Sequence, residues 1–147
     1  MTNWDVRWLD LASYISSWSK DPSTKVGCVV VGADREIRAT GYNGFPRGTS
    51  DGKELYADRE VKHLRVVHAE ANAVAAAARV GVSLKGTTAY VTHPCCAQCA
   101  ALLIQAGVSR VVIPGAAELR PEWKKSALAG VILFAEAGVE WSLASET

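Results

Sequence analysis

The spacing of apolar residues divides this chain into helical and extended segments. From Trp4 to Trp18, apolar side chains recur every three or four positions. This spacing predicts an amphipathic helix that ends near Lys20 and packs its aromatic side chains into the core. The nearly continuous apolar run from Val26 to Val31 predicts a strand buried on both faces. We expect residues 36–41 to return beside it as the second strand of a hairpin.

The rest of the chain alternates between predicted helices and predicted strands. In order, the predicted segments are a helix at 69–80 with Gly81 as C-cap, a strand at 88–92, a helix from Cys96 to Gly107, a strand at 108–113, a helix at 121–137 and a strand at 139–143. Residues 41–52 are rich in Gly, Pro and Asn and are predicted to form a loop. The polar stretch 53–62 is expected to contain a helical turn or to be mobile.

This order of elements predicts an α/β fold. Five strands and several covering helices imply a three-layer α/β/α sandwich with a mixed five-stranded sheet, in which right-handed crossovers carry the later helices. At 147 residues, with 49% hydrophobic residues, the chain is expected to be a single domain spanning residues 1–147.

Charge and cysteine content limit the classes of function. The net charge of +1 gives no electrostatic grip on long nucleic acid, although a small anionic substrate needs only a local basic patch. No apolar run is long enough to cross a bilayer, and the residues from Met1 to Asp5 do not resemble a signal peptide. Four cysteines are too few for a disulfide scaffold in a chain of this size, so we expect a protein of the reducing cytoplasm.

Candidate metal ligands gather in two short motifs. Cys96 and Cys99 are separated by two residues, a common way to present two thiolates to one zinc ion. His68 adds a nitrogen ligand, and Glu70 lies two residues after it. Three protein ligands leave the fourth position of a tetrahedral zinc for water, which is typical of a catalytic zinc site. We therefore predict His68, Cys96 and Cys99 as ligands and Glu70 as the catalytic acid/base.

Other interpretations of these cysteines stay open at this point. Cys95 and Cys99 are four residues apart and could also share a helix face, although the two-residue gap favours Cys96. The pair could be a redox centre, but that leaves His68 and Glu70 without a role. A closed structural zinc site would need a fourth ligand, for which the chain offers His63, His93, Cys28 and Cys95. His93 is expected to be a surface side chain.

Four segments resemble the deoxycytidylate (dCMP) deaminase family of the cytidine deaminase-like superfamily. They are Thr24–Gly27, Gly41–Gly48, His68–Ala73 and Cys96–Ala100. The His-x-Glu motif combined with Cys-x-x-Cys is the signature of zinc nucleobase deaminases. The resemblance implies a five-stranded sheet flanked by helices and one catalytic zinc ion held by the three predicted ligands.

The resemblance also implies substrate contacts and partners. It implies that Asn43 hydrogen-bonds the base and Asn72 the sugar. Ala69 is a further candidate contact, and Lys25 and Arg47 are our candidates for the substrate phosphate. Members of the family are commonly homo-oligomers, often hexamers, and some are activated by dCTP and inhibited by dTTP.

The chain departs from the family pattern at three places. Cys95 replaces the proline that usually precedes the first zinc cysteine. Thr49 stands where relatives often have a cysteine, in some of them for a second, structural zinc, so that second ion is not expected here. Residues 53–67 do not align with the pattern, so the resemblance leaves effector control open.

The zinc motifs and the resemblance to the family together predict zinc-dependent hydrolytic deamination of dCMP to dUMP and ammonia. A zinc-activated water would attack cytosine C4, with Glu70 as the proton shuttle. Two alternatives remain. One is another deaminase of the same superfamily, acting on cytidine, guanine or tRNA adenosine, although a tRNA enzyme is expected to carry more basic charge. The other is a noncatalytic zinc-binding interaction module.

Overall fold

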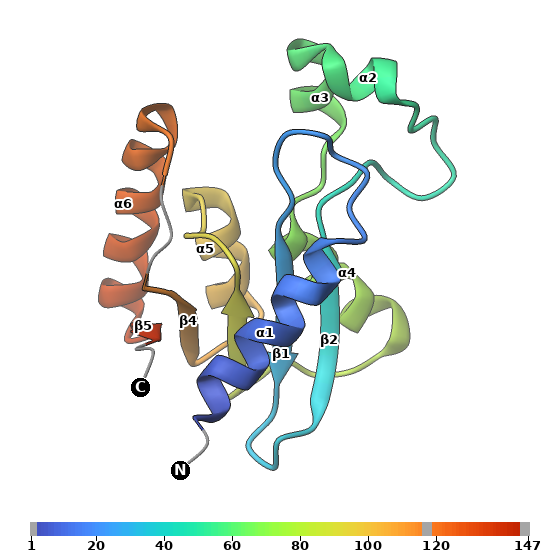
Figure 1. The fold of residues 1–147 in the computed structure, drawn as a ribbon. Coiled ribbons are helices and arrows are strands. Elements are labelled where there is room, and N and C mark those ends of the chain that lie inside the picture. The colour runs from blue at the N-terminus through green and yellow to red at the C-terminus, as the bar shows by residue number, and fades with distance from the viewer. Residues whose placement is uncertain (1–2, 116–118, 145–147) are drawn as a thin grey trace.

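A computed structural model describes residues 3–115 and 119–144, so the predicted domain limits at 1 and 147 lie outside the described residues. Its centre is one five-stranded sheet with the strand order β2-β1-β3-β4-β5 (Figure 1). The strands are β1 (Gly27–Val31), β2 (Ile37–Tyr42), β3 (Thr88–Val91), β4 (Arg110–Pro114) and β5 (Glu140–Ala144). β1 is antiparallel to β2 and β3, whereas β3, β4 and β5 are parallel. The predicted mixed sheet is confirmed.

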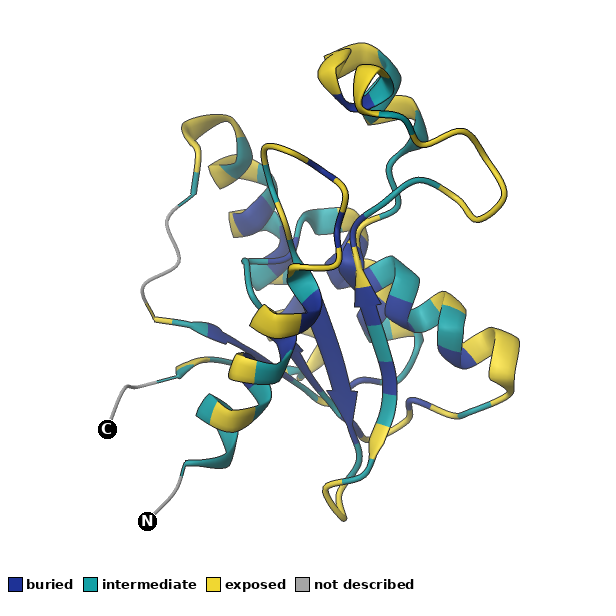
Figure 2. Ribbon diagram, turned by 45° about the vertical axis from the view of Figure 1, so that its right-hand side comes forward, coloured by how far each residue is buried: buried dark blue, intermediate teal, exposed yellow. Residues whose placement is uncertain are grey.

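Helices cover both faces of the sheet unequally. Helix α1 (Trp4–Ser16) packs on one face, and α4 (Ala69–Val80), α5 (Ala97–Gln105) and α6 (Pro121–Ala137) pack on the other. Alternate residues of β1 serve the two layers, since Val29 packs with the α1 side and Val30 with the side of α4 and α5. Figure 2 shows the strands in the middle of the sheet as almost wholly buried. The predicted three-layer α/β/α arrangement is confirmed.

The first helix is shorter than its apolar pattern predicts. It ends at Ser16, after which the backbone N–H groups of Ser17, Trp18 and Ser19 donate to carbonyls three residues back in place of four. Trp18 is consequently 52% exposed. The prediction that the whole aromatic stripe packs into the core is therefore wrong for Trp18.

The polar stretch after the loop forms two short helices, α2 (Lys53–Ala57) and α3 (Arg59–Arg65). The carboxylate of Asp58 caps α3 by accepting from the backbone N–H groups of Glu60 and Val61. Figure 1 shows both helices beyond the end of the sheet, away from the three layers. Tyr56 of α2 is buried and stacks on Phe45, whereas no residue of α3 is buried, so polar contacts contribute most to holding α3 in place.

One close approach fixes the helix that carries the predicted site. Gly41 of β2 lies against α4, and a Cβ atom at this position would meet the carbonyl oxygen of Ala69 and stand 2.6 Å from the amide nitrogen of Ala73. Only glycine allows this separation. The small residues of α4 therefore lie directly on β2 and β1.

In the described ranges, no helix combines the length and the apolar character that a membrane crossing requires.

Candidate metal centre and substrate cavity

Two helix N-termini bring the three predicted metal ligands together. His68 is the N-cap of α4, Cys96 is the N-cap of α5, and Cys99 lies in the first turn of α5. The Nδ1 atom of His68 is 3.4 Å from each of the two sulfur atoms. Tetrahedral zinc with ordinary Zn–S and Zn–N bonds separates its sulfur and nitrogen ligands by about 3.6 Å. The donor set and its spacing therefore fit zinc.

The electrostatics of the cluster favour thiolate. Both ligand motifs lie where helix dipoles attract negative charge, and Sγ of Cys96 accepts from the backbone N–H of Cys99 at 3.4 Å. The Cys99 thiol donates to the Cys96 sulfur, and His68 lies beside it; together they lower the pKa of Cys96 to about 4. Because the Cys99 thiol donates this hydrogen bond, the pKa of Cys99 is raised. Because the hydrogen bond with Cys96 favours the imidazolium, the pKa of His68 is raised.

The structure brings Cys96, and not Cys95, together with His68 and Cys99. Cys95 is only 3% exposed and belongs to the core cluster beneath the helices. In the part of the chain that the structure describes, the three residues above are the only set of His, Cys, Asp or Glu whose donor atoms lie within 4.8 Å of one another. None of the four candidates for a fourth ligand joins them, which argues against a closed site.

Glu70 stands in the first turn of α4, two residues after the histidine ligand. It is 3% exposed and lines the cavity described below. Burial raises the pKa of its carboxyl group above the ordinary value. A raised pKa makes this carboxyl group a better proton acceptor than an ordinary glutamate, which suits a general acid/base.

A cavity of about 660 Å³ opens over this cluster. Its volume is within the usual range for a small-molecule site. His68, Cys96 and Glu70 form part of the wall, and the loop after α1, the α2–α3 segment and the beginning of α6 contribute further residues. Its lysine and arginine side chains are Arg59, Lys62 and Arg120, and its histidines are His63, His68 and His93.

The predicted substrate residues divide into two groups. Asn43 and Ala69 line the cavity, whereas Asn72, Lys25 and Arg47 are not among its lining residues. The amide of Asn72 donates to the carbonyl of Tyr42 at 2.7 Å, and the ammonium of Lys25 donates to the carbonyl of Ser19 at 2.7 Å. Arg47 is exposed on its loop. The structure therefore brings two of the five candidates to the site.

Sequence reasoning missed the basic residues of the wall. Arg59 pairs with Glu122 at 3.4 Å, and Lys62 pairs with Asp21 at 2.7 Å. These contacts join segments far apart in the chain, so no local pattern reveals them. His93 was also misjudged, since it is a partly buried residue of the cavity wall, where burial lowers its pKa.

Comparison with known proteins accounts for this arrangement. Residues 2–114 match the family model described as the cytidine and deoxycytidylate deaminase zinc-binding region. The chain belongs to this family. The match, together with the three-donor cluster, supports zinc as the metal. The chain is thus a deaminase, a member of the hydrolase class, as predicted.

Several relatives extend the likeness beyond the zinc-binding region. An uncharacterized deaminase in the luxG 3' region of Aliivibrio fischeri is 40% identical over 95% of this chain and 92% of its own length. A probable deoxycytidylate deaminase of Caenorhabditis elegans is 46% identical over 71% of this chain. The aligned region spans 54% of the nematode protein and 63% of the human deoxycytidylate deaminase, so these relatives are considerably longer than the aligned part.

A solved structure shares the fold along nearly the whole chain. The dCMP deaminase of cyanophage S-TIM5, in complex with dCMP and dUMP, superposes with a TM-score of 0.77 and 26% sequence identity. The superposition covers 98% of this chain and 100% of the phage chain. The predicted cytidine deaminase-like fold is confirmed.

Proposed function

We propose that this protein hydrolyses dCMP to dUMP and ammonia with one zinc ion at the cluster of His68, Cys96 and Cys99. The observation that carries the proposal is that His68 and Cys96 of that cluster line one cavity together with Glu70 and several basic side chains. A three-ligand site beside a buried carboxyl group supports hydrolytic chemistry rather than a purely structural role.

The residues of the chain divide the chemistry between them. A zinc ion held by His68, Cys96 and Cys99 would lower the pKa of a water molecule, so that this water could act as the nucleophile near neutral pH. Glu70 takes the proton of the attacking water and delivers it to N3 of the cytosine ring. It then assists the departure of the C4 amino group as ammonia. Its side chain is only 3% exposed, which limits the contact of this carboxyl group with bulk water.

We assign the substrate phosphate to the basic side of the cavity. Lys62, Arg59 and Arg120 line the wall, and their ammonium and guanidinium groups are suited to a phosphate monoester. Lys25 and Arg47 have no place in this wall, so this assignment replaces them as phosphate contacts. Asn43 and Ala69 line the wall and are retained as contacts to the base and sugar. The role of Asn72 at the sugar stays a prediction.

The likeness to the S-TIM5 enzyme supports dCMP over the other substrates of the superfamily, because that protein was crystallised with dCMP and dUMP. The chain's charge of +1 does not favour a tRNA substrate. We also predict a homo-oligomer, possible responses to dCTP and dTTP, and a cytoplasmic location in keeping with the four free cysteines.

The test is a substrate panel on the purified zinc-loaded protein. Ammonia release is followed with dCMP, CMP, deoxycytidine, cytidine and guanine at equal concentrations. We expect the highest kcat/KM with dCMP, and a kcat/KM for deoxycytidine at least tenfold lower because it lacks the phosphate. Equal rates for dCMP and deoxycytidine would contradict the phosphate assignment. Zinc binding without turnover of any of these compounds would favour the noncatalytic module.

A further inference from the structure

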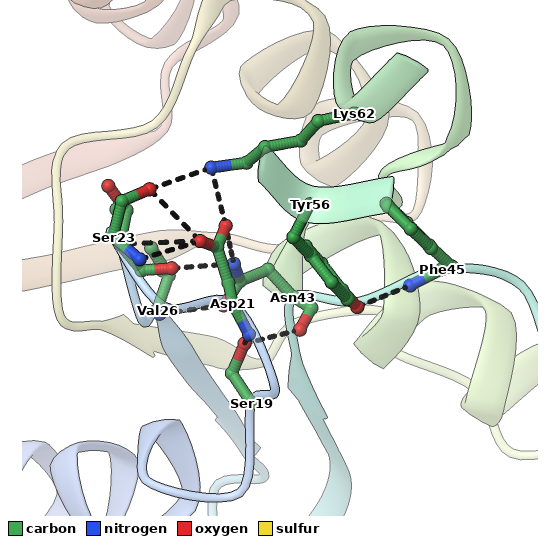
Figure 3. A network of polar contacts seen from close by, with 9 residues as sticks. Ser19, Asp21, Ser23, Val26, Asn43, Phe45, Tyr56 and Lys62 are labelled. Atoms are coloured by element: carbon green, nitrogen blue, oxygen red, sulfur yellow. Dashed lines mark hydrogen bonds and ion pairs between the residues drawn. The ribbon is translucent and has the colours of Figure 1, made fainter. Parts of the chain in front are cut away.

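Asp21 lies at the centre of a polar network beside the cavity. Its side chain, in the loop between α1 and β1, is only 1% exposed and lines the cavity wall. The carboxylate accepts from the backbone N–H and hydroxyl of Ser23 and from the backbone N–H of Thr24. Figure 3 shows that the side chains of Asn43 and Lys62 also lie around this carboxylate, and both contact its Oδ2 atom. A buried carboxylate with this many donors is fixed in one position.

The first of these two contacts sets the orientation of Asn43. Its Nδ2 donates to Oδ2 of Asp21 at 3.3 Å and to the carbonyl of Thr24 at 2.9 Å. Its Oδ1 accepts from the backbone N–H of Val26 at 2.8 Å. Because the carboxylate can only accept and the backbone N–H can only donate, the amide has one permitted orientation. Asp21 therefore fixes a side chain that we retained as a contact to the base or sugar.

The second contact fixes Lys62 of α3. Its ammonium lies 2.7 Å from Oδ2 of Asp21 and donates to the hydroxyl of Ser23 at 3.0 Å. Two of its three N–H donors are thereby used, which leaves one for a ligand in the cavity. Since α3 buries none of its own residues, this ion pair with a buried carboxylate is a principal tie between α3 and the loop after α1.

The charges of the network show which partners dominate. Burial alone raises the pKa of Asp21, but the hydrogen bonds from Lys62, Ser23 and Thr24 outweigh it, and the pKa is lowered overall. The carboxylate is therefore ionised at neutral pH and stays paired with the ammonium. Removing one partner of such a pair leaves the other without compensation, which is costly for a buried group.

We propose that Asp21 is a positioning residue. It holds the cavity-wall amide of Asn43 and the ammonium of Lys62 at fixed relative positions, so that both can contact one bound nucleotide. This inference rests on the proposed function. Asp21 acts through its two partners and does not itself touch the reacting atoms. Its Oδ2 atom contacts both Asn43, which meets the base or sugar of the substrate, and Lys62, which meets the phosphate. Loss of Asp21 thus weakens recognition and leaves the zinc–Glu70 chemistry intact.

The experiment compares steady-state kinetics of Asp21→Asn and Lys62→Met on dCMP and on deoxycytidine. We expect Asp21→Asn to raise the KM for both substrates, by about tenfold or more for dCMP, with kcat within about threefold of wild type. Lys62→Met is expected to raise the KM for dCMP only. In the double variant, the rise in the KM for dCMP should be smaller than the two single effects combined, because the two residues contact each other.

Controls separate this role from a general loss of structure. Asp10→Asn and Lys53→Met change exposed residues that do not line the cavity, and both should match wild type. Zinc content and thermal midpoint are measured for every variant. If Asp21→Asn fails to bind zinc, the Lys62→Met variant still tests the proposal. An equal rise of its KM for dCMP and for deoxycytidine would contradict the role of Lys62 at the phosphate. A KM within twofold of wild type in Asp21→Asn overturns it, whereas an inactive wild type would overturn the proposed function instead.

Discussion

The Nδ1 atom of His68 lies 3.4 Å from the sulfur of Cys96, although 28 positions separate the two residues in the chain. Each residue is the N-cap of a helix, and both helices pack on the same face of the sheet. The donors are therefore positioned by the core and not by a free loop. Sites built on helices are positioned more precisely than sites on loops.

Replacing one cysteine of the adjacent pair should separate ligand from core residue. We expect Cys96→Ala to lose zinc and ammonia release together, because one of three ligands is gone. Cys95→Ala should retain one zinc per chain and lose about 1 kcal/mol of stability, since it removes a small buried group. Metal analysis after gel filtration and urea unfolding give the two readouts. If Cys96→Ala retains zinc and Cys95→Ala loses it, then Cys95 is the ligand and Cys96 is not.

Glu70 should be needed for turnover but not for metal binding. Glu70→Gln preserves the size of the buried side chain and removes its capacity to carry a proton. We expect unchanged zinc content and a fall in kcat of about 10²- to 10⁴-fold. Glu136→Gln, an exposed position in the last turn of α6, is the matched control and should match wild type. A kcat for Glu70→Gln within tenfold of wild type would exclude it as the proton shuttle.

Local patterns predicted the regular elements well. Gly81 and Gly138 end α4 and α6 in the left-handed conformation, and Pro121 begins α6, as expected from their types. The burial of β1 on both faces also followed from its unbroken apolar run. The metal ligands were predictable for a related reason, since both motifs are short and each begins a helix.

Features that depend on distant contacts were not predictable. Nothing near Lys62 in the sequence indicates that its partner is Asp21, which the fold alone brings beside it. Lys25 appeared a suitable phosphate contact by charge, yet its ammonium donates to a carbonyl of its own loop. By contrast, the capping residue Asp58 was a local signal for α3 that the prediction of residues 53–62 did not use.

The ion pair between Asp5 and Arg110 should give a specific pH dependence of stability. The guanidinium donates to both carboxylate oxygens, at 2.9 and 2.7 Å, and ties α1 to β4. Its hydrogen bonds lower the pKa of Asp5. A lowered folded-state pKa contributes stability that is present above the unfolded-state value and is lost as the pH falls through the folded-state value.

We therefore expect Asp5→Asn to cost about 1 to 2 kcal/mol at pH 7, and the difference from wild type to shrink below about pH 4. Urea unfolding at a series of pH values measures that difference, and zinc release at low pH affects both proteins alike. Asp10→Asn, an exposed residue of the same helix, should be neutral throughout. A penalty for Asp5→Asn that is constant from pH 7 to 3 would show that the ion pair is not its source.

The close approach of β2 to α4 links stability to metal affinity. In Gly41→Ala, the new Cβ would meet the backbone of Ala69 and Ala73, which cannot give way as a flexible side chain can. The helix must shift, at a cost of about 1 to 3 kcal/mol. Because α4 carries His68 at its N-terminus, the shift also displaces a zinc ligand, and we expect zinc affinity to fall about 10- to 100-fold.

Gly44→Ala is the matched control, since its Cβ would meet only the hydroxyl of Tyr56 at 3.7 Å, an ordinary contact. Thermal midpoints and competition with a zinc chelator measure both effects, and a Gly41→Ala variant that equals Gly44→Ala in both would show that α4 is not held by this contact.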